Sequence, residues 1–293
     1  IFLLTLNAKE QALLIPFEIT LPSQRKPLFE YTSYITSVNN YLYDGVINLI
    51  LDKKYQTGDE LKNAINCSLI SMFLRTSKNL EYLSLNEVIC SQVIFENLYE
   101  NTTITSIDLN ALNNYFRSMA IDNTGLTSLN LRYNSIGSEG GKAFADALGI
   151  NITLKNLNLS YNNLDSEGGK ALAVALCKNA TLTSLDICEN NLGSEGGRAL
   201  ADALCKNTAL ISLNLRKNNL GLEGGRALAD ALYKNTALTS LNIGYNHIGP
   251  EGGKALADAL YRNATLTSLN LANNNLGSEG GKAFADALYK NTA

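Results

Sequence analysis

The sequence predicts an α/β fold in which short strands and helices alternate along a solenoid. Two observations carry this prediction. A glycine-pair segment such as "SEGGKAFADAL" (residues 138–148) returns every 28 residues, and the stretch of leucines before it returns at the same interval. A fixed period of roughly 20 to 50 residues is typical of stacked repeats that each form one supersecondary unit. We therefore expect one layer of strands and one layer of helices in residues 126–293.

The strand comes first in each repeat. Six stretches fit the pattern LxxLxLxxNxL, with isoleucine replacing some leucines, and they begin at Leu126, Leu154, Leu182, Leu210, Leu238 and Leu266. In "LTSLNL" the leucines alternate with polar residues, which indicates a strand buried on one face. So short a strand needs neighbours, so we expect the copies to pair in a parallel sheet.

An asparagine follows each strand, at the point where the chain leaves the sheet. Its amide can satisfy backbone groups that no strand partner reaches. Repeated in every copy, these side chains are expected to form an internal polar ladder made of Asn134, Asn162, Asn190, Asn218, Asn246 and Asn274.

The glycine pair opens the helix of each repeat. Helical spacing places Phe144 and Leu148 on one face and Lys142 on another. We expect Ser138 to cap this helix and the glycines to let neighbouring backbones approach closely. A phosphate loop would need Ser or Thr after the lysine. Alanine stands there in every copy, so the glycine pair is interpreted as a structural corner.

These repeats resemble the ribonuclease-inhibitor-like subclass of leucine-rich repeat proteins, which also includes the sensor arms of NOD-like receptors and Ran GTPase-activating proteins. The resemblance rests on the LxxLxLxxNxL pattern and the 28-residue period, and it covers residues 126–293. The implied architecture is a horseshoe with the parallel β-sheet on its concave face and the α-helices on its convex face. No functional residue is carried over, because only the scaffold matches.

Three domains are expected along the chain. Residues 1–45 would form an N-terminal cap or degenerate repeats, residues 46–125 irregular leucine-rich repeats, and residues 126–293 six regular repeats without a C-terminal cap. In the middle region "VINLIL" (46–51), "LEYLSL" (80–85) and "ITSIDL" (104–109) fit the strand template, and "GDELKNAINCSLISMFL" (58–74) fits a helix. A separate small domain is the alternative. The uncapped C-terminal end is expected to permit oligomer formation.

Composition narrows the function classes. The formal net charge is −3 and only 17% of residues are charged, so we expect no nucleic acid partner. No apolar run approaches the length of about 18 residues that would predict a membrane span. Five cysteines without a CxxC pair favour a cytoplasmic, reducing compartment, with delivery into another cell left open. Sequons at Asn66, Asn101, Asn151, Asn179 and Asn263 point weakly the other way, although three of them simply recur with the repeat.

Catalytic groups are sparse. The one histidine, His247, replaces a polar turn residue of the other copies, so it is interpreted as a turn substitution. A single histidine cannot build a two-histidine metal site or a readable catalytic triad. We therefore expect a protein that is not an enzyme, with no cofactor and no metal.

A binding surface is predicted where the copies differ. The two residues before the ladder asparagine vary most. The first should project from the concave sheet and the second should lie at its rim, so Tyr133 should neighbour Tyr161 and Glu189 should face Lys217. Tyrosine and arginine often anchor protein interfaces. The candidate protein-binding residues are Arg132, Tyr133, Tyr161, Glu189, Arg216, Lys217 and Tyr245. Drift at tolerant surface positions is the alternative.

The function expected from these features is a non-catalytic interaction module that binds a protein partner on its concave face. A regulator of a small GTPase, like the Ran activators, is one alternative, with Arg132 or Arg216 as its candidate arginine. The ligand-sensing arm of a larger NOD-like receptor is another, although this chain carries no phosphate loop of its own.

Overall fold

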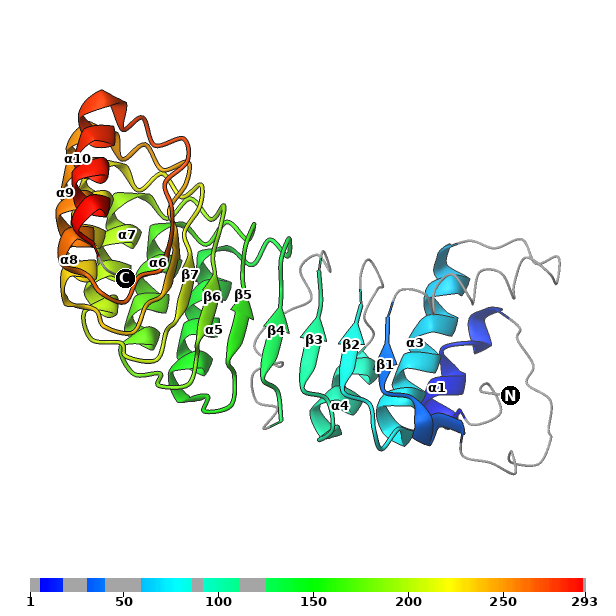
Figure 1. Ribbon diagram of the computed structural model, residues 1–293. Coiled ribbons are helices and arrows are strands. Elements are labelled where there is room, and N and C mark those ends of the chain that lie inside the picture. Colours follow the sequence, from blue (N-terminus) through cyan, green and yellow to red (C-terminus); the bar gives the residue numbers. More distant parts are fainter. Residues whose placement is uncertain (1–5, 18–30, 40–58, 86–91, 111–124, 292–293) are drawn as a thin grey trace. The chain divides into compact units, whose positions relative to one another are not determined.

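The computed structural model describes residues 6–17, 31–39, 59–85, 92–110 and 125–291 (Figure 1). These residues belong to two compact units. Unit 1 comprises residues 1–115 and 122–129, and unit 2 comprises residues 116–121 and 130–293. Within each unit the strands lie side by side in the order of the sequence. The predicted α/β repeat architecture is confirmed.

Unit 2 consists of strand–helix pairs. Its first strand residue is Asn130, the last residue of β4 (Ser128–Asn130). Its complete strands are β5 (Asn156–Asn158), β6 (Ser184–Asp186), β7 (Ser212–Asn214), β8 (Ser240–Asn242) and β9 (Ser268–Asn270). The helices between and after them are α5 (Gly137–Ile150), α6 (Asp165–Leu176), α7 (Gly193–Leu204), α8 (Gly221–Lys234), α9 (Gly249–Arg262) and α10 (Gly277–Lys290). Figure 1 shows the strands of this unit in one layer and its helices in another.

The strands of unit 2 pair in parallel, in the register that the sequence repeat dictates. Asn156 pairs with Ser184, and Ser184 pairs with Ser212, so each step equals one 28-residue repeat. The central leucine of each strand is buried between the layers, as Leu185 and Leu213 illustrate. Helix leucines such as Leu200 cover them from the other side. Burial of each such side chain contributes about 1.5–3 kcal/mol, which offsets the cost of ordering so short a strand.

The glycine pairs are structural corners. The second glycine of a pair lies against the next repeat: an added Cβ at Gly225 would stand 2.6 Å from Cγ2 of Ile248. The predicted cap by Ser138 is wrong. Helix α5 begins at Gly137 and its N-cap residue, Ile136, makes no side-chain cap hydrogen bond. The helix begins one residue before Ser138, so Ser138 lies inside its first turn, and the Ile136 and Gly137 amides donate to the Asn162 side chain and carbonyl of the next repeat, over 3.4 and 2.9 Å.

We predict opposite effects for alanine at two equivalent glycines. At Gly225 the methyl group would collide with the β-branched Ile248, so we expect Gly225→Ala to destabilise unit 2 by about 1–2 kcal/mol despite better helix propensity. At Gly281 nothing lies within 4 Å of the added Cβ, so Gly281→Ala should stabilise it by up to about 1 kcal/mol. Urea unfolding of both variants measures this. Equal signs would contradict the account.

The six asparagines that follow the strands form a hydrogen-bonded ladder. The amide N–H of Asn162 donates to Oδ1 of Asn190 over 3.0 Å, and the N–H of Asn190 donates to Oδ1 of Asn218 over 2.9 Å. The Nδ2 of Asn162 donates to carbonyls of its own repeat and of the preceding one, at Leu159 and Leu131. The same contacts link Asn134, Asn218, Asn246 and Asn274.

A second asparagine ladder ties each helix end to the next strand. The Nδ2 of Asn179 donates to the carbonyls of Leu148 and Asn151, while its Oδ1 accepts from the amides of Thr181 and Leu182. Asn207, Asn235 and Asn263 repeat these contacts. The sequons at Asn179 and Asn263 are therefore repeat structure. Both side chains are buried and hydrogen-bonded, so neither can carry a glycan in the folded state.

Unit 1 contains less regular elements. They are α1 (Ala8–Ala12), the 3-10 helices η2 (Ile15–Phe17) and η3 (Tyr31–Tyr34), β1 (Ser37–Val38), α3 (Asp59–Thr76), β2 (Tyr82–Ser84), α4 (Gln92–Glu100), β3 (Ser106–Asp108) and the start of β4. β1 pairs in parallel with β2, and β2 with β3. The strands expected in "LEYLSL" and "ITSIDL" and the helix expected at 58–74 are thus present. "VINLIL" (46–51) lies outside the described residues.

Helix α1 docks on α3 through one buried ion pair. Glu10 is fully buried, and both its carboxylate oxygens accept hydrogen bonds from Arg75, each over 2.9 Å. Glu10 also closes a capping box with Asn7 at the start of α1. The Ser68 hydroxyl of α3 donates to the Glu10 carbonyl over 2.9 Å. One side chain therefore fixes both the start of α1 and its position on α3.

Candidate protein-binding surface

The seven candidate residues come together in unit 2, where the strands lead into their exit loops. We call them the rim cluster: Arg132, Tyr133, Tyr161, Glu189, Arg216, Lys217 and Tyr245. They come from five successive repeats, so the parallel register sets their order across the sheet. Each contacts a neighbour in the cluster, which makes the rim cluster one continuous surface.

Aromatic rings and one arginine form the first end of the rim cluster. The rings of Tyr133 and Tyr161 have centroids 4.2 Å apart and are inclined by 32°. The Arg132 guanidinium lies 4.6 and 4.7 Å from these two centroids, and its Nη2 donates to the Tyr133 hydroxyl over 3.1 Å. Such cation–π contacts hold the arginine flat against the rings. Tyr133 remains 42% exposed, so a broad apolar surface faces solvent.

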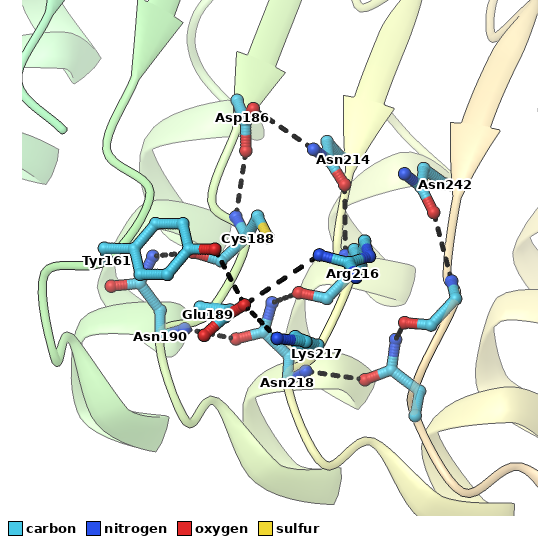
Figure 2. Close-up of polar contacts among 12 residues, drawn as sticks. Tyr161, Asp186, Cys188, Glu189, Asn190, Asn214, Arg216, Lys217, Asn218 and Asn242 are labelled. Atoms are coloured by element: carbon cyan, nitrogen blue, oxygen red, sulfur yellow. Dashed lines mark hydrogen bonds and ion pairs between the residues drawn. The ribbon is translucent and has the colours of Figure 1, made fainter. Parts of the chain in front are cut away.

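Glu189 lies at the centre of the rim cluster. Figure 2 shows its carboxylate between Tyr161 on one side and Lys217 and Arg216 on the other. Its Oε1 accepts from the Tyr161 hydroxyl over 2.8 Å and pairs with Lys217 Nζ at 2.6 Å. Arg216 Nη1 is farther away, at 3.8 Å. The carboxylate therefore joins the aromatic end to the basic end.

The basic end stacks on a third tyrosine. The Arg216 guanidinium lies 4.4 Å from the ring centroid of Tyr245, and Lys217 Nζ lies 5.8 Å from it. The expectation that the first residue of each varied pair is presented to solvent fails for three copies. Ser160, Cys188 and Gly244 are buried, because all three are small and, at Cys188, the Arg216 side chain lies against the thiol.

These contacts shift two pKa values. The hydrogen bond to the Glu189 carboxylate, with burial second, raises the pKa of Tyr161 to about 12. Burial opposes ionisation of Glu189, yet the hydrogen bonds from Lys217 and Tyr161 outweigh it and lower the pKa of that carboxyl. At neutral pH Glu189 is therefore ionised and Tyr161 donates to it.

We predict that Glu189→Gln lowers the Tyr161 pKa towards the ordinary value of about 10, because the charged acceptor is lost. The folded pKa lies above the unfolded one. The bond thus stabilises the fold below pH of about 10 and ceases to do so as pH rises through about 12. Ultraviolet titration, taken as the difference between each protein and its Tyr161→Phe counterpart, reports this pKa. An unchanged Tyr161 transition in Glu189→Gln would refute the assignment.

The backbone of the rim is strained. Tyr133, Tyr161, Glu189, Lys217 and Tyr245 all have φ between +54° and +60°. Left-handed backbone costs a residue with a Cβ about 1–2 kcal/mol, and asparagine tolerates it best. The equivalent residue of the last repeat is indeed an asparagine, Asn273, with φ +56°. The same conformation recurs two residues further on in each loop, from Ser135 to Asn275, so it belongs to the turn that follows each strand.

An open groove of about 350 Å³ runs beside the rim cluster. Four rim residues line it together with the polar residues two positions further along three of the loops, namely Ser135, Asn163 and Asn191. Among the described residues no group of three or more potential metal ligands occurs, there or elsewhere. The groove offers aromatic surface, amides and one ion pair, which suits binding more than chemistry.

The strand layer contributes a row of amides that sequence reasoning missed. We call Asn130, Asn158, Asn214, Asn242 and Asn270 the donor row; Asp186 takes this position in β6. In every copy Oδ1 accepts from the backbone amide two residues further on, as in Asn242 to Gly244 at 3.1 Å. That bond turns the Nδ2 group of each asparagine away from the backbone. The strict recurrence of this asparagine in the strand is the sequence signal that marks the row.

Comparison with known proteins identifies the repeats. The family described as "Leucine Rich repeat" matches residues 122–145, 151–173, 178–201, 206–229, 234–257 and 262–285. Each segment contains one strand from β4 to β9 and most of the helix that follows it. The chain is a leucine-rich repeat protein. No curated protein matches its sequence.

Three solved structures are similar to this chain, and the first of them shares its leucine-rich repeat fold. The leucine-rich repeat-containing protein LegL7 from Legionella pneumophila matches with a TM-score of 0.54 and 24% identity, over 94% of this chain and 98% of that one. The tropomodulin C-terminal domain of Caenorhabditis elegans matches with a TM-score of 0.45 and 15% identity, over 51% and 92%. Leiomodin-1 actin-binding site 2 matches with a TM-score of 0.45 and 21% identity, over 50% and 86%.

The leucine-rich repeats give the rim cluster a regular support. Stacked repeats of this kind imply a protein-interaction module, because they present an extended, pre-formed surface. In the part of the chain that the structure describes, no helix has both the length and the apolar character to cross a membrane.

Proposed function

We propose that unit 2 is a protein-binding module that holds a partner on its strand layer and rim cluster. The observation that carries this proposal is the exposed stack of Tyr133 and Tyr161 with Arg132, held on a strained backbone. Tyrosine and arginine are enriched among the residues that dominate interface energies. A stack fixed before binding also loses little conformational entropy when a partner arrives.

The binding is proposed to occur without catalysis and in a reducing, cytoplasmic compartment. The rim cluster contains a tyrosine with a raised pKa and a carboxyl with a lowered one, so neither is poised to transfer protons near neutral pH. Cys177 is an exposed free thiol, and such thiols persist where disulfides are rare. Delivery into another cell's cytoplasm would satisfy the same condition.

The rim geometry favours binding over GTPase activation. A catalytic arginine must extend towards the phosphates of its partner enzyme. Arg132 instead lies on two tyrosine rings and Arg216 lies on Tyr245. A sensor arm of a NOD-like receptor would also bind its ligand on the strand layer. That alternative differs from the binding proposal only in the rest of the polypeptide.

Affinity capture with matched variants tests the proposal. Wild-type protein would be compared with a Tyr133→Ala, Tyr161→Ala, Arg216→Ala variant in lysate from the native source. The chain offers a close control on the helix layer. There Arg262 of α9 donates a 3.1 Å hydrogen bond to the Tyr233 hydroxyl of α8, and Tyr261 lies beside Arg262 on α9. The control variant is therefore Tyr233→Ala, Tyr261→Ala, Arg262→Ala.

We expect the wild type and the helix-layer control to capture the same protein and the rim variant to lose it. Unfolding curves of all three proteins would establish that the variants are folded. If the rim variant retains the partner while the helix-layer control loses it, the binding surface is the helix layer and the proposal is wrong.

A further inference from the structure

The strand layer of unit 2 presents more hydrogen-bond donors than acceptors. In the donor row each Oδ1 is engaged by a backbone amide, which leaves Nδ2 as the outward group. Only Asn214 uses its Nδ2 within the described part of the chain, donating to Asp186 over 3.1 Å. Asn130, Asn158, Asn242 and Asn270 have no Nδ2 partner there. These four amides are available to acceptors on another molecule.

The charges on the same surface are also unbalanced. The rim cluster holds three cations and one carboxylate, and Asp186 of β6 adds a second carboxylate, so the surface has a net charge of +1, whereas the whole chain has a net charge of −3. Arg132 forms no ion pair with any carboxylate of the described residues, and its Nε is buried without a hydrogen-bond partner. Arg216 and Lys217 share Glu189. Both oxygens of Asp186 already accept hydrogen bonds, from Cys188 and Asn214.

We propose that this surface binds an extended, carboxylate-rich segment of a partner protein. The inference rests on the proposed function and names the chemistry of the partner. Carboxylates would pair with Arg132 at one end and with Arg216 and Lys217 at the other, while the donor row takes backbone carbonyls between them. The apolar faces of Tyr133 and Tyr161 take the uncharged side chains.

Register sets the spacing of the carboxylates. Arg132 and Arg216 are three repeats apart, which corresponds to about 14 Å across a parallel sheet. An extended chain advances about 3.3 Å per residue, so about four residues span this distance. Glu189 lies between the two ends and would repel an acid placed opposite it. The fitting segment therefore has two acids about four residues apart with uncharged residues between them.

Fluorescence anisotropy with labelled peptides tests the inference. The probe is an acidic peptide in which glutamates are separated by three serine or glycine residues. Peptides with glutamine or lysine at the same positions and a single-stranded oligothymidylate serve as comparisons. The proteins are the wild type, Arg132→Gln with Arg216→Gln, Asn130→Asp with Asn158→Asp, and a control with the same loss of charge on the helix layer, Lys254→Gln with Lys282→Gln.

We expect the acidic peptide to bind and the glutamine and lysine peptides to bind at least about tenfold more weakly. Both strand-layer variants should weaken the acidic peptide by a similar factor, whereas the helix-layer control should leave it unchanged. The isosteric asparagine-to-aspartate changes test the donor row without altering its shape. Added salt should weaken binding, because the contacts are between charges that remain partly exposed.

Several results would overturn the inference. One is no binding of the acidic peptide; others are equal binding of the glutamine peptide, tighter binding of the oligonucleotide, and an equal loss in the helix-layer control. The failure of the broader proposal is recognised separately. If lysate capture depends on the rim cluster but acidic peptides do not bind, the partner has another chemistry. If capture does not depend on the rim cluster, the proposed function itself fails.

Discussion

Replacing Asn190 by alanine is expected to destabilise unit 2 by about 3–5 kcal/mol. The side chain is fully buried and serves five backbone groups in two repeats. They are the carbonyls of Leu159, Ile187 and Cys188 and the amides of Asn162 and Leu164. Alanine would leave these groups without that partner, and a buried unsatisfied group costs about 1–3 kcal/mol. Because stacked repeats are stabilised by their interfaces, the loss weakens the interface between the repeat of β5 and that of β6.

Urea unfolding followed by circular dichroism measures this effect, with Asn156→Ala as the matched control. Asn156 lies on the exposed surface of β5, and its side chain makes no hydrogen bond among the described residues. Its replacement should change the free energy of unfolding by no more than about 0.5 kcal/mol. If both variants lost a similar free energy of unfolding, the ladder asparagine would stabilise the fold no more than an exposed asparagine does, and the account would be wrong.

The second large effect is expected in unit 1. Arg75→Ala would leave the Glu10 carboxylate buried without its cation, which costs about 3–5 kcal/mol for a buried pair. Helix α1 should then detach from α3, because the Ser68 hydroxyl bond to the Glu10 carbonyl is the weaker contact that remains. Hydrogen exchange of the α1 and α3 amides measures the change. We expect exchange to accelerate in α1 first.

Lys9→Ala is the control for this prediction. Lys9 pairs with Glu96 at 3.1 Å, but its side chain is 73% exposed, so the pair should contribute less than about 1 kcal/mol. Slow exchange of α1 in Arg75→Ala, equal to that in Lys9→Ala, would contradict the role assigned to the buried pair.

The repeat made much of unit 2 predictable from sequence. Identical spacing places equivalent residues on neighbouring strands, so the contacts of Tyr133 with Tyr161 and of Glu189 with Lys217 followed from register alone. The hydrogen bond from Tyr161 to Glu189 was not predicted, because it depends on how far each side chain leans from its strained backbone. Local rules also misled us at Ser138. A serine at a helix start predicts a cap, but the helix begins earlier, at Gly137, whose amide is held by the Asn162 carbonyl of the next repeat.

In unit 1 the sequence patterns predict less of the structure. Strand β1 has only two residues, too few for any alternation to show. The Glu10–Arg75 pair joins residues 65 positions apart, and neither belongs to a repeated motif that would mark it. The helix at Asp59–Thr76 was predictable because its length and composition indicate a helix without reference to its neighbours.

Photo-crosslinking tests the central claim most directly. A benzoylphenylalanine at position 161, in the rim cluster, would be compared with one at position 233, on helix α8; both replace exposed or half-buried tyrosines. After irradiation of the protein bound to its captured partner, we predict a covalent product from position 161 and none from position 233. A product from position 233 alone would place the partner on the helix layer and contradict the account.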